Sequence, residues 1–409
     1  MFFSESSYTE LDPFINAFGK CNKATINQTD SLIFRKTISR LYKDIYDAYS
    51  SINIDEFNVD YNNYPIVMPE IITKTKFLDT EIHAFLTDTD NKIKQIHVSH
   101  NINNFKVDIF LNLFPSNKKV NINQCITYII TWLTLCSKYT SAKCIKSLTL
   151  YVFFTPFKKK LPGALEHTLG AKHVNSGVTN SCKIDGEIVV YREEEWFKVF
   201  IHETMHAFGF DFSNTSMVDV KNKMVKIFNI DSDFLIYEAY SETWARLLNC
   251  IFCGFKNLKN KKDEKSFIIN VDFCFELERK FSSFMSVKIL DFMKCKYIDL
   301  IESNKNDKMM GKYRENSNVL AYYVITSIFM NSYQEFVVWC DSNDLGIVGN
   351  VEFSNDKIYS FIEFIHKYRN CETMNKLIGV MEQIYNESFN SNNESILGQS
   401  TRMTIISTL

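Results

Sequence analysis

Two histidines four residues apart occur in the stretch VFIHETMHAFGFDF, residues 199–212, and a glutamate directly follows the first of them. On an α-helix, residues i and i+4 lie on one face, with their Cβ atoms about 5–6 Å apart. His202 and His206 can therefore each bring a ring nitrogen to about 2.0–2.1 Å from a single zinc ion. Glu203 would then lie beside the metal, where it can accept a proton from a zinc-bound water. This HExxH pattern is typical of metal-dependent hydrolases.

The residues around the pattern predict a buried helix. Its neighbours at 200–201, 204–205 and 207–208 are uncharged, and Gly209 is placed to end the helix. Three glutamates at 193–195 would lie in the first turn, where carboxylates suit the positive end of the helix dipole. The alternative is an ordinary core helix, but a chain with 8 histidines contains HExxH by chance in roughly one protein in a hundred.

A catalytic zinc needs a third protein ligand and one open position. The completion HExxHxxGxxH fails because Phe212 holds the last position, with Asp211 one residue out of register. The stretch 231–252 instead predicts a mostly apolar helix, interrupted one turn apart by Glu238 and Glu242. Two unpaired buried carboxylates would be costly, so one would bind zinc and the other would hold the far ring nitrogen of a ligand histidine. Exposure of both to solvent is the alternative.

The segments before this helix predict a small mixed sheet. A helix is expected at 122–140, strands at 147–155 and 187–192, and an edge strand at 174–179.

The predicted edge strand supplies the candidate substrate-binding residues Asn175, Ser176 and Gly177. Gly177 would permit close approach of a substrate backbone, and Asn175 can hydrogen-bond a substrate carbonyl. A bulge in an ordinary strand would explain the same residues equally well.

Peptide hydrolysis also needs a group that stabilises the developing oxyanion. Tyr322 and Tyr323 lie on a predicted helix, and His366 is isolated. Either tyrosine could serve, and we name Tyr323. A core or surface role is the alternative for both.

Composition narrows the class of protein. Of 409 residues, 45% are hydrophobic and 23% charged, which favours a large buried core. A net charge of -2 gives no electrostatic reason to expect nucleic acid. The 11 cysteines are scattered, which favours reduced thiols. No signal peptide or membrane span is recognised, so we expect a soluble intracellular protein.

The chain is expected to have three parts. Residues 1–120 form a mixed α/β region of unknown role, and residues 121–385 form the catalytic domain, with strands up to about 212 and helices after it. Residues 386–409 are rich in Asn and Ser, which predicts a disordered tail.

HETMH followed by EAYSE at 238–242 resembles the gluzincin branch of the zincin metallopeptidases. Thermolysin-like and angiotensin-converting-enzyme-like peptidases carry E-A-x-[SG]-D at this point. The resemblance implies an α+β zincin-like fold with an active-site helix, one Zn²⁺ ion, and a peptide or protein substrate. It also implies Glu238 as ligand and Glu242 behind a ligand histidine. Because other gluzincins read E-x-x-A, which fits residues 242–245, Glu242 is the alternative ligand.

KHVNSGVT and EEEWFKVFIHETMHAFGFDF also resemble segments of zincin-like proteins of large nucleocytoplasmic DNA viruses, over residues 145–330 at best. That resemblance implies a viral protein of the host cytoplasm or the virion. The stretch GALEH at 163–167 resembles, in three positions, the G-x-M-E-N element of zinc aminopeptidases. The choice between endopeptidase and exopeptidase stays open, and a catalytically silent zincin-fold protein stabilised by zinc is the alternative function.

Overall fold

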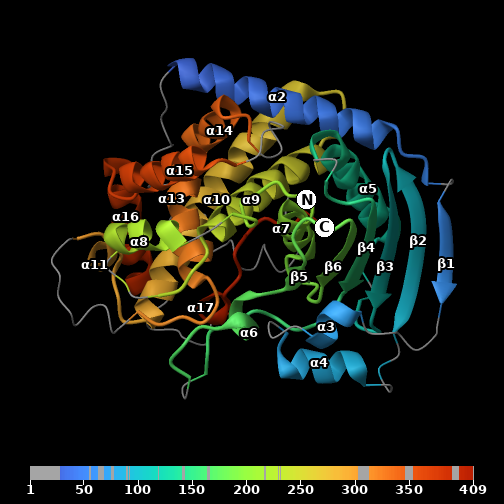
Figure 1. Cartoon of the computed structure of the whole chain (residues 1–409), viewed down its shortest axis with the longest axis horizontal. Helices are drawn as coiled ribbons and strands as arrows, with labels where there is room; N and C mark the ends of the chain where they lie inside the picture. Colours follow the sequence, from blue (N-terminus) through green and yellow to red (C-terminus); the bar gives the residue numbers. More distant parts are fainter. Residues whose placement is uncertain are drawn as a thin grey trace.

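The computed structural model describes residues 28–408 except for 55–56, 63–68, 75–77, 89–90, 92, 118, 141–142, 164–165, 216–217, 229, 231, 303–312, 346–352 and 389–395. A mixed sheet stands beside a mainly helical part, and the predicted histidine helix, α7, lies between them (Figure 1). The expected α+β class is confirmed at this level. None of the described helices is both long and apolar enough to cross a membrane.

The sheet has six strands in the order β1-β2-β3-β4-β6-β5. Neighbours β3, β4 and β6 run parallel, whereas β1 and β2 at one edge and β5 at the other are antiparallel to their neighbours. Buried side chains alternate along β2 and the first part of β3, as expected of strands with one covered face. The strands are β1 (Asn58–Asn62), β2 (Lys94–Ile102), β3 (Phe105–Leu113), β4 (Ser147–Phe153), β5 (Gly177–Thr179) and β6 (Asp185–Val190).

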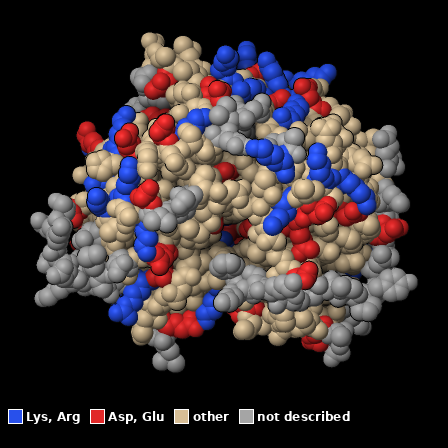
Figure 2. All heavy atoms as spheres, in the orientation of Figure 1, with Lys and Arg blue, Asp and Glu red and all other residues tan. Residues whose placement is uncertain are grey.

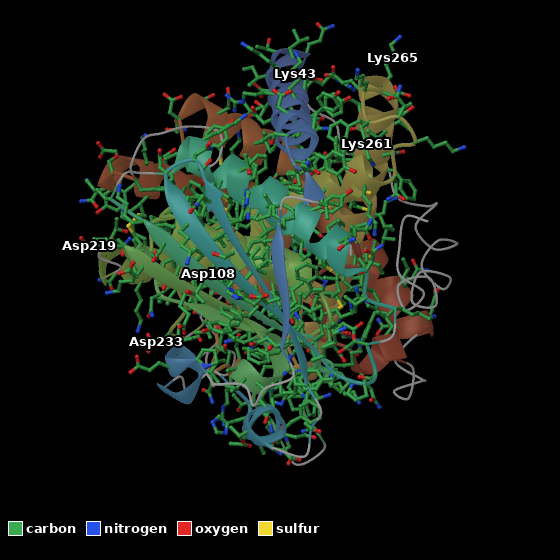
Figure 3. All side chains as sticks on the ribbon, turned by 90° about the vertical axis from the view of Figure 1, so that its right-hand side faces the viewer. Lys43, Asp108, Asp219, Asp233, Lys261 and Lys265 are labelled. Atoms are coloured by element: carbon green, nitrogen blue, oxygen red, sulfur yellow. A yellow bond between two sulfur atoms is a disulfide. The ribbon has the colours of Figure 1, made fainter. Side chains whose placement is uncertain are left out.

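Short helices and one long helix surround the sheet (Figure 1). Figure 3 looks from the sheet side, with Asp108 of β3 among the strands, where it pairs with His97 and Lys106. The helices of this part are α2 (Gln28–Ser50), α3 (Glu70–Lys74), α4 (Thr80–Thr87), α5 (Ile122–Tyr139) and α6 (Ala171–Val174).

The helical part is built around α9 and α10, which pack closely. A Cβ at Gly254 of α9 would lie 2.5 Å from Cγ2 of Val271 on α10, so glycine permits the contact. The elements of this part are α7 (Trp196–Ala207), α8 (Val218–Ile227), α9 (Ile236–Lys256), α10 (Glu264–Phe292), α11 (Tyr297–Ile301), a π-helical turn (Leu320–Ile325), α13 (Thr326–Asn331), α14 (Tyr333–Ser342), α15 (Asn355–Tyr368), α16 (Glu372–Ser388) and α17 (Ile396–Gln399).

The predicted division at residue 120 does not separate two cores. Strand β3 precedes it and pairs in parallel with β4 after it. Helix α2 packs on α14, near the other end of the chain, and one hydrophobic cluster runs from Phe34 to Ile406.

The predicted disordered tail is wrong for residues 396–408. Residues 400–406 are buried, because groups in the core satisfy their backbone. The N–H groups of Met403 and Thr404 donate to Oε1 of Glu195 over 2.8 and 2.6 Å. The N–H of Ile405 donates to Oε2 of Glu278 over 3.1 Å.

The expectation of reduced thiols is wrong for one pair of cysteines. Cys144 and Cys182, whose Cα atoms lie 4.7 Å apart, form a disulfide. The other cysteines of the described residues form no disulfide.

The surface mixes charges of both signs. Basic and acidic side chains are interspersed over the face in Figure 2, which is hollowed near its centre, where Figure 1 shows α7.

Candidate metal centre

Helix α7 is buried along its whole length. The prediction that the glutamates at 193–195 lie in its first turn is wrong, because the helix begins only at Trp196. Glu195 has a φ of 60° and instead turns its carboxylate to the C-terminal segment. At the other end, Gly209 has a φ of +69°, and the N–H of Phe210 donates to the carbonyl of Met205 over 2.8 Å. This is the predicted glycine-ended helix.

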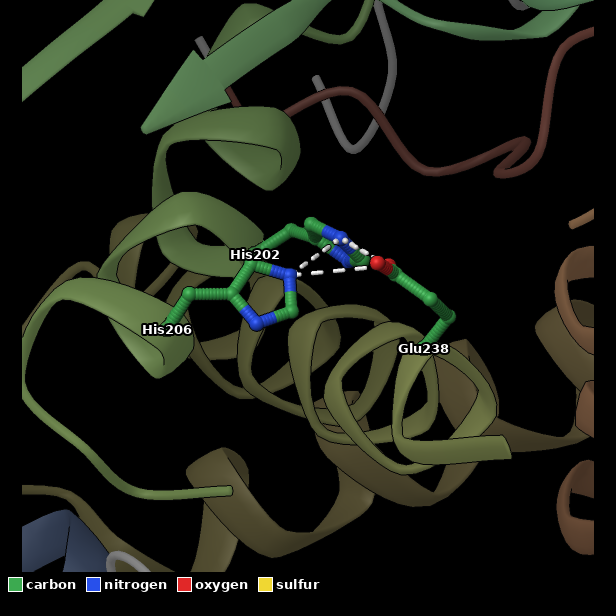
Figure 4. A group of neighbouring side chains, drawn as sticks. All are labelled: His202, His206 and Glu238. Carbon is green, nitrogen blue, oxygen red and sulfur yellow. Dashed lines mark hydrogen bonds and ion pairs between the residues drawn. The ribbon is translucent and has the colours of Figure 1, made fainter. Parts of the chain in front are cut away.

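Three potential ligand atoms converge between α7 and α9 (Figure 4). Nε2 of His202 lies 3.2 Å from Nε2 of His206 and 3.2 Å from Oε2 of Glu238. Nε2 of His206 lies 3.5 Å from the same oxygen. Ligand atoms 2.0–2.1 Å from a tetrahedral ion lie about 3.3 Å from one another. Two imidazoles and one carboxylate in this triangle therefore fit a divalent metal ion.

Glu238 is the carboxylate of this group, as the sequence predicted. Burial raises its pKa, but His206 and His202 outweigh that effect and hold the pKa well below its ordinary value. The carboxylate thus stays ionised, as a metal ligand must be.

Glu242, one turn further along α9, supports His202 from behind. Its Oε2 lies 3.2 Å from Nδ1 of His202. The ammonium of Lys198 donates to both of its oxygens over 2.9 Å, and Nε of Arg246 donates to Oε1 over 2.8 Å. Burial raises the pKa of Glu242, but the two cations lower it well below its usual range. Glu242 thus lies behind a potential ligand histidine, which is its predicted position. The alternative, in which Glu242 itself is the ligand, would require its carboxylate in the triangle, where Glu238 lies instead.

Asp211 supports His206 in the same way, which sequence reasoning missed. Its Oδ2 contacts Nδ1 of His206 and accepts a hydrogen bond from the hydroxyl of Ser241 over 3.0 Å. Oδ1 accepts from the backbone N–H and the hydroxyl of Ser213. The turn at Gly209 was the available signal, because a chain that reverses there returns residue 211 to the end of α7. Phe212, in the position of the rejected third ligand, is buried in the hydrophobic core.

Glu203 lies beside the triangle, against the edge strand β5. A Cβ at Gly177 would lie 2.8 Å from Oε1 of Glu203 and 2.7 Å from Cγ1 of Val199. The absence of a side chain at Gly177 therefore makes room for Glu203. The sequence instead predicts that Gly177 makes room for a substrate backbone. Burial raises the pKa of Glu203, although His202 and His206 lower it.

The predicted substrate-binding residues line a small cavity of about 40 Å³ next to Glu203. Asn175, Ser176 and Gly177 form one wall of it. The predicted strand at 174–179 is shorter in the structure, since only Gly177–Thr179 pairs with β6, and it is an edge strand as expected. The side-chain carbonyl of Asn175 accepts a hydrogen bond from Ser317 over 3.2 Å.

The structure brings Tyr322 to the site and not Tyr323. The hydroxyl of Tyr322 donates to Oε2 of Glu238 over 3.0 Å. The hydroxyl of Tyr323 donates to the carbonyl of Thr401 over 2.5 Å, away from the triangle. His366 is exposed on α15. In the stretch 163–167, residues 164–165 lie outside the described residues, and Glu166 pairs with Lys172 and His173, not with the metal group.

No family model, curated protein or solved structure matches the chain.

Proposed function

We propose that the chain is a zinc-dependent metallopeptidase. The observation that carries the proposal is the triangle of His202, His206 and Glu238, with side lengths of 3.2, 3.2 and 3.5 Å. Two imidazoles and one carboxylate are a donor set found in catalytic zinc sites, which keep an open position. Zinc bound there would polarise a peptide carbonyl and make an attacking water more acidic.

The residues around the triangle have matching roles. Glu203 would accept the proton of the attacking water, and burial raises the pKa of its carboxyl, in the direction that strengthens a base. Oδ2 of Asp211 contacts Nδ1 of His206, and Oε2 of Glu242 lies 3.2 Å from Nδ1 of His202 without hydrogen-bond geometry. Both carboxylates would leave Nε2 of each imidazole to the metal. The edge of β5 that pairs with no described strand would offer backbone groups to an extended substrate.

The hydroxyl of Tyr322 is the candidate donor to the developing oxyanion. It already reaches Oε2 of Glu238, and it lines the same cavity as Glu203. In this role the hydroxyl would exchange its hydrogen bond to Glu238 for one to a substrate oxygen. We assign it the role that the sequence gave to Tyr323.

The resemblance to gluzincins agrees with this proposal. An antiparallel edge strand lies beside the histidine helix, and Glu238 and Glu242 follow on α9, at positions that support the roles that the resemblance implies. A zincin-like fold is therefore part of the proposal. Viral origin and cellular location stay predictions.

A catalytically silent zincin-fold protein is the second candidate. The observation that favours it is the size of the cavity beside Glu203, about 40 Å³, with Met403 of the C-terminal segment in its wall. In that case the metal would stabilise the fold only.

Metal content and cleavage of a broad peptide library separate the two candidates. Wild type should bind one zinc ion and cleave peptides. Glu203→Gln should retain the metal and lose activity by about 10²–10⁴-fold, whereas Glu363→Gln, at an exposed position of α15, should behave as wild type. His206→Ala should lose the metal.

Two results decide against the proposal. Equal cleavage by wild type and Glu203→Gln would refute the mechanism. Stoichiometric metal without any cleavage would favour the silent protein.

A further inference from the structure

The small cavity beside Glu203 contains polar groups whose hydrogen-bonding capacity is not fully used. Ser176, only 3% exposed, has a hydroxyl with no hydrogen-bond partner among the described residues. Lys159, 1% exposed, pairs with Glu195, and its ammonium has no other acceptor in the described part of the chain. An ammonium group has three N–H donors. Both side chains line the cavity.

Lys198, in the same cavity wall, also has a poorly used donor. Two of its N–H groups donate to the oxygens of Glu242 over 2.9 Å. The third faces the sulfur of Met403 at 3.6 Å, and a thioether is a weak acceptor.

The carboxylates of Glu195 and Glu242 do not fully neutralise Lys159 and Lys198, because each carboxylate also accepts hydrogen bonds from other donors. Glu195 also accepts hydrogen bonds from the N–H groups of Met403 and Thr404. Glu242 also binds Arg246 and lies next to His202. Two ammonium groups and a hydroxyl thus line the cavity, and the carboxylate of Glu203 in the same wall accepts a hydrogen bond from none of them within the described part of the chain.

Buried polar groups are normally hydrogen-bonded, so unused donors at a cavity call for a ligand. A carboxylate offers two oxygens with about four acceptor positions, and charge-assisted hydrogen bonds are the strong kind. The cavity volume of about 40 Å³ admits about three water-sized groups. It can therefore hold the head of a short acidic side chain and excludes large side chains.

We propose that this cavity is a subsite for a carboxylate that the substrate carries next to the scissile bond. The inference rests on the proposed peptidase function, since the cavity borders Glu203. The carboxylate can come from an aspartate side chain or from the free carboxyl terminus of a peptide. The chemistry of recognition is the same in both cases.

A matched peptide series tests the subsite in the full-length protein. The peptides differ only at the residues that flank the cleaved bond, which are Asp, Asn or Ala, and each is made with a free and an amidated carboxyl terminus. We expect kcat/KM to be at least ten-fold higher for Asp than for Asn, which has the same shape without the charge. A ten-fold preference for the free terminus, without one for Asp, would assign the cavity to a terminal carboxylate.

Two serine variants supply the control. Ser176→Ala should reduce the ratio of kcat/KM between the Asp and Asn peptides about three-fold or more. Ser286→Ala removes another fully buried hydroxyl without a partner among the described residues, from α10 and outside the cavity, and should leave the preference unchanged. Lys159→Met should abolish the preference, but it leaves Glu195 unpaired and can impair folding, so the serine pair is decisive.

A binding measurement separates failure of this inference from failure of the proposed function. By calorimetry, wild type should bind N-acetyl-aspartyl methylamide at least ten-fold more tightly than its asparaginyl counterpart, or an N-acetyl dipeptide acid more tightly than its amide. That result would support the subsite even if no peptide were cleaved. Cleavage without any carboxylate preference, together with equal binding within each pair, would overturn the subsite and leave the peptidase function intact.

Discussion

His202 and His206 lie on one face of α7, and each has a carboxylate next to Nδ1, yet the two carboxylates are held in different ways. Glu242, behind His202, is bound by the cations Lys198 and Arg246. Asp211, behind His206, is bound by the hydroxyls and one backbone N–H of Ser213 and Ser241. One ligand is thus supported by a buried ionic network and the other by neutral donors.

The difference indicates that Glu242 contributes more to the stability of the fold than Asp211 does. Glu242 connects α9 to α7 through Lys198, and Arg246 continues to the hydroxyl of Ser282 on α10 and the carbonyl of Tyr322. Asp211 lies only five residues from the histidine that it holds, so most of its contacts are local. We therefore expect changes behind His202 to affect the whole protein and changes behind His206 to affect mainly the metal.

The largest effect is expected for Glu242→Gln. The change leaves the ammonium of Lys198 and the guanidinium of Arg246, whose side chains are 3% and 0% exposed, without their shared carboxylate. Removing one partner from a buried ionic group costs about 3–5 kcal/mol. Chemical denaturation of the metal-free protein should show a loss of this size in the free energy of unfolding. A loss below 1 kcal/mol would mean that the network does not support the fold.

A smaller effect, which depends on pH, is expected from Glu278 on α10. Its Oε1 lies 3.9 Å from Arg246, and its Oε2 binds the C-terminal segment. Burial raises its pKa from 4.5 to about 7, although Arg246 lowers it. The folded protein thus holds this proton more tightly than the unfolded chain does, and stability must fall as pH rises from 4.5 through 7. The loss amounts to at most about 3 kcal/mol.

Denaturation between pH 5 and 8 measures this contribution. In Glu278→Gln, the free energy of unfolding should lack this fall with rising pH. Glu363→Gln, at an exposed position of α15, is the control and should keep the wild-type slope. Parallel curves for wild type and Glu278→Gln would refute the assignment.

The parts of the site that the sequence predicted are those set by short-range spacing. His202, His206 and Glu203 share one helix, and Glu238 and Glu242 share another, so helical periodicity alone fixes which side chains lie on one face. Asp211 was considered only as a ligand, because the glycine at 209 indicates that the chain turns there but not which imidazole nitrogen residue 211 then reaches. Arg246 lies four residues after Glu242 on the same helix, so the same periodicity could have paired the two. Lys198 comes from α7 and could not be paired with Glu242 without the tertiary structure.

Two further errors have physical causes of the same kind. Tyr322 and Tyr323 are adjacent, and which of them faces the site depends on the π-helical turn, whose extra residue changes the direction of the side chains. The C-terminal residues looked like a disordered tail because Asn and Ser dominate up to 395. Their burial depends on Glu195 and Glu278, which accept hydrogen bonds from the backbone and are distant in sequence.

The smallest effect on stability is expected for Asp211→Asn, the same carboxylate-to-amide change behind the other histidine. Oδ1 of Asp211 binds the donors of Ser213, and Oδ2 binds Ser241 and His206, so a single amide oxygen can keep only one of these two sets of partners. The free energy of unfolding should therefore fall by about 1–2 kcal/mol. Metal affinity should fall by about 10–100-fold, because the amide is a poorer acceptor for the far ring nitrogen of His206. Competition with a chelator measures the affinity, and denaturation of the same sample without metal measures the stability. Glu242→Gln should weaken the metal by a similar factor but destabilise the fold more. Equal losses of stability in the two variants would remove the distinction between an ionic and a neutral support.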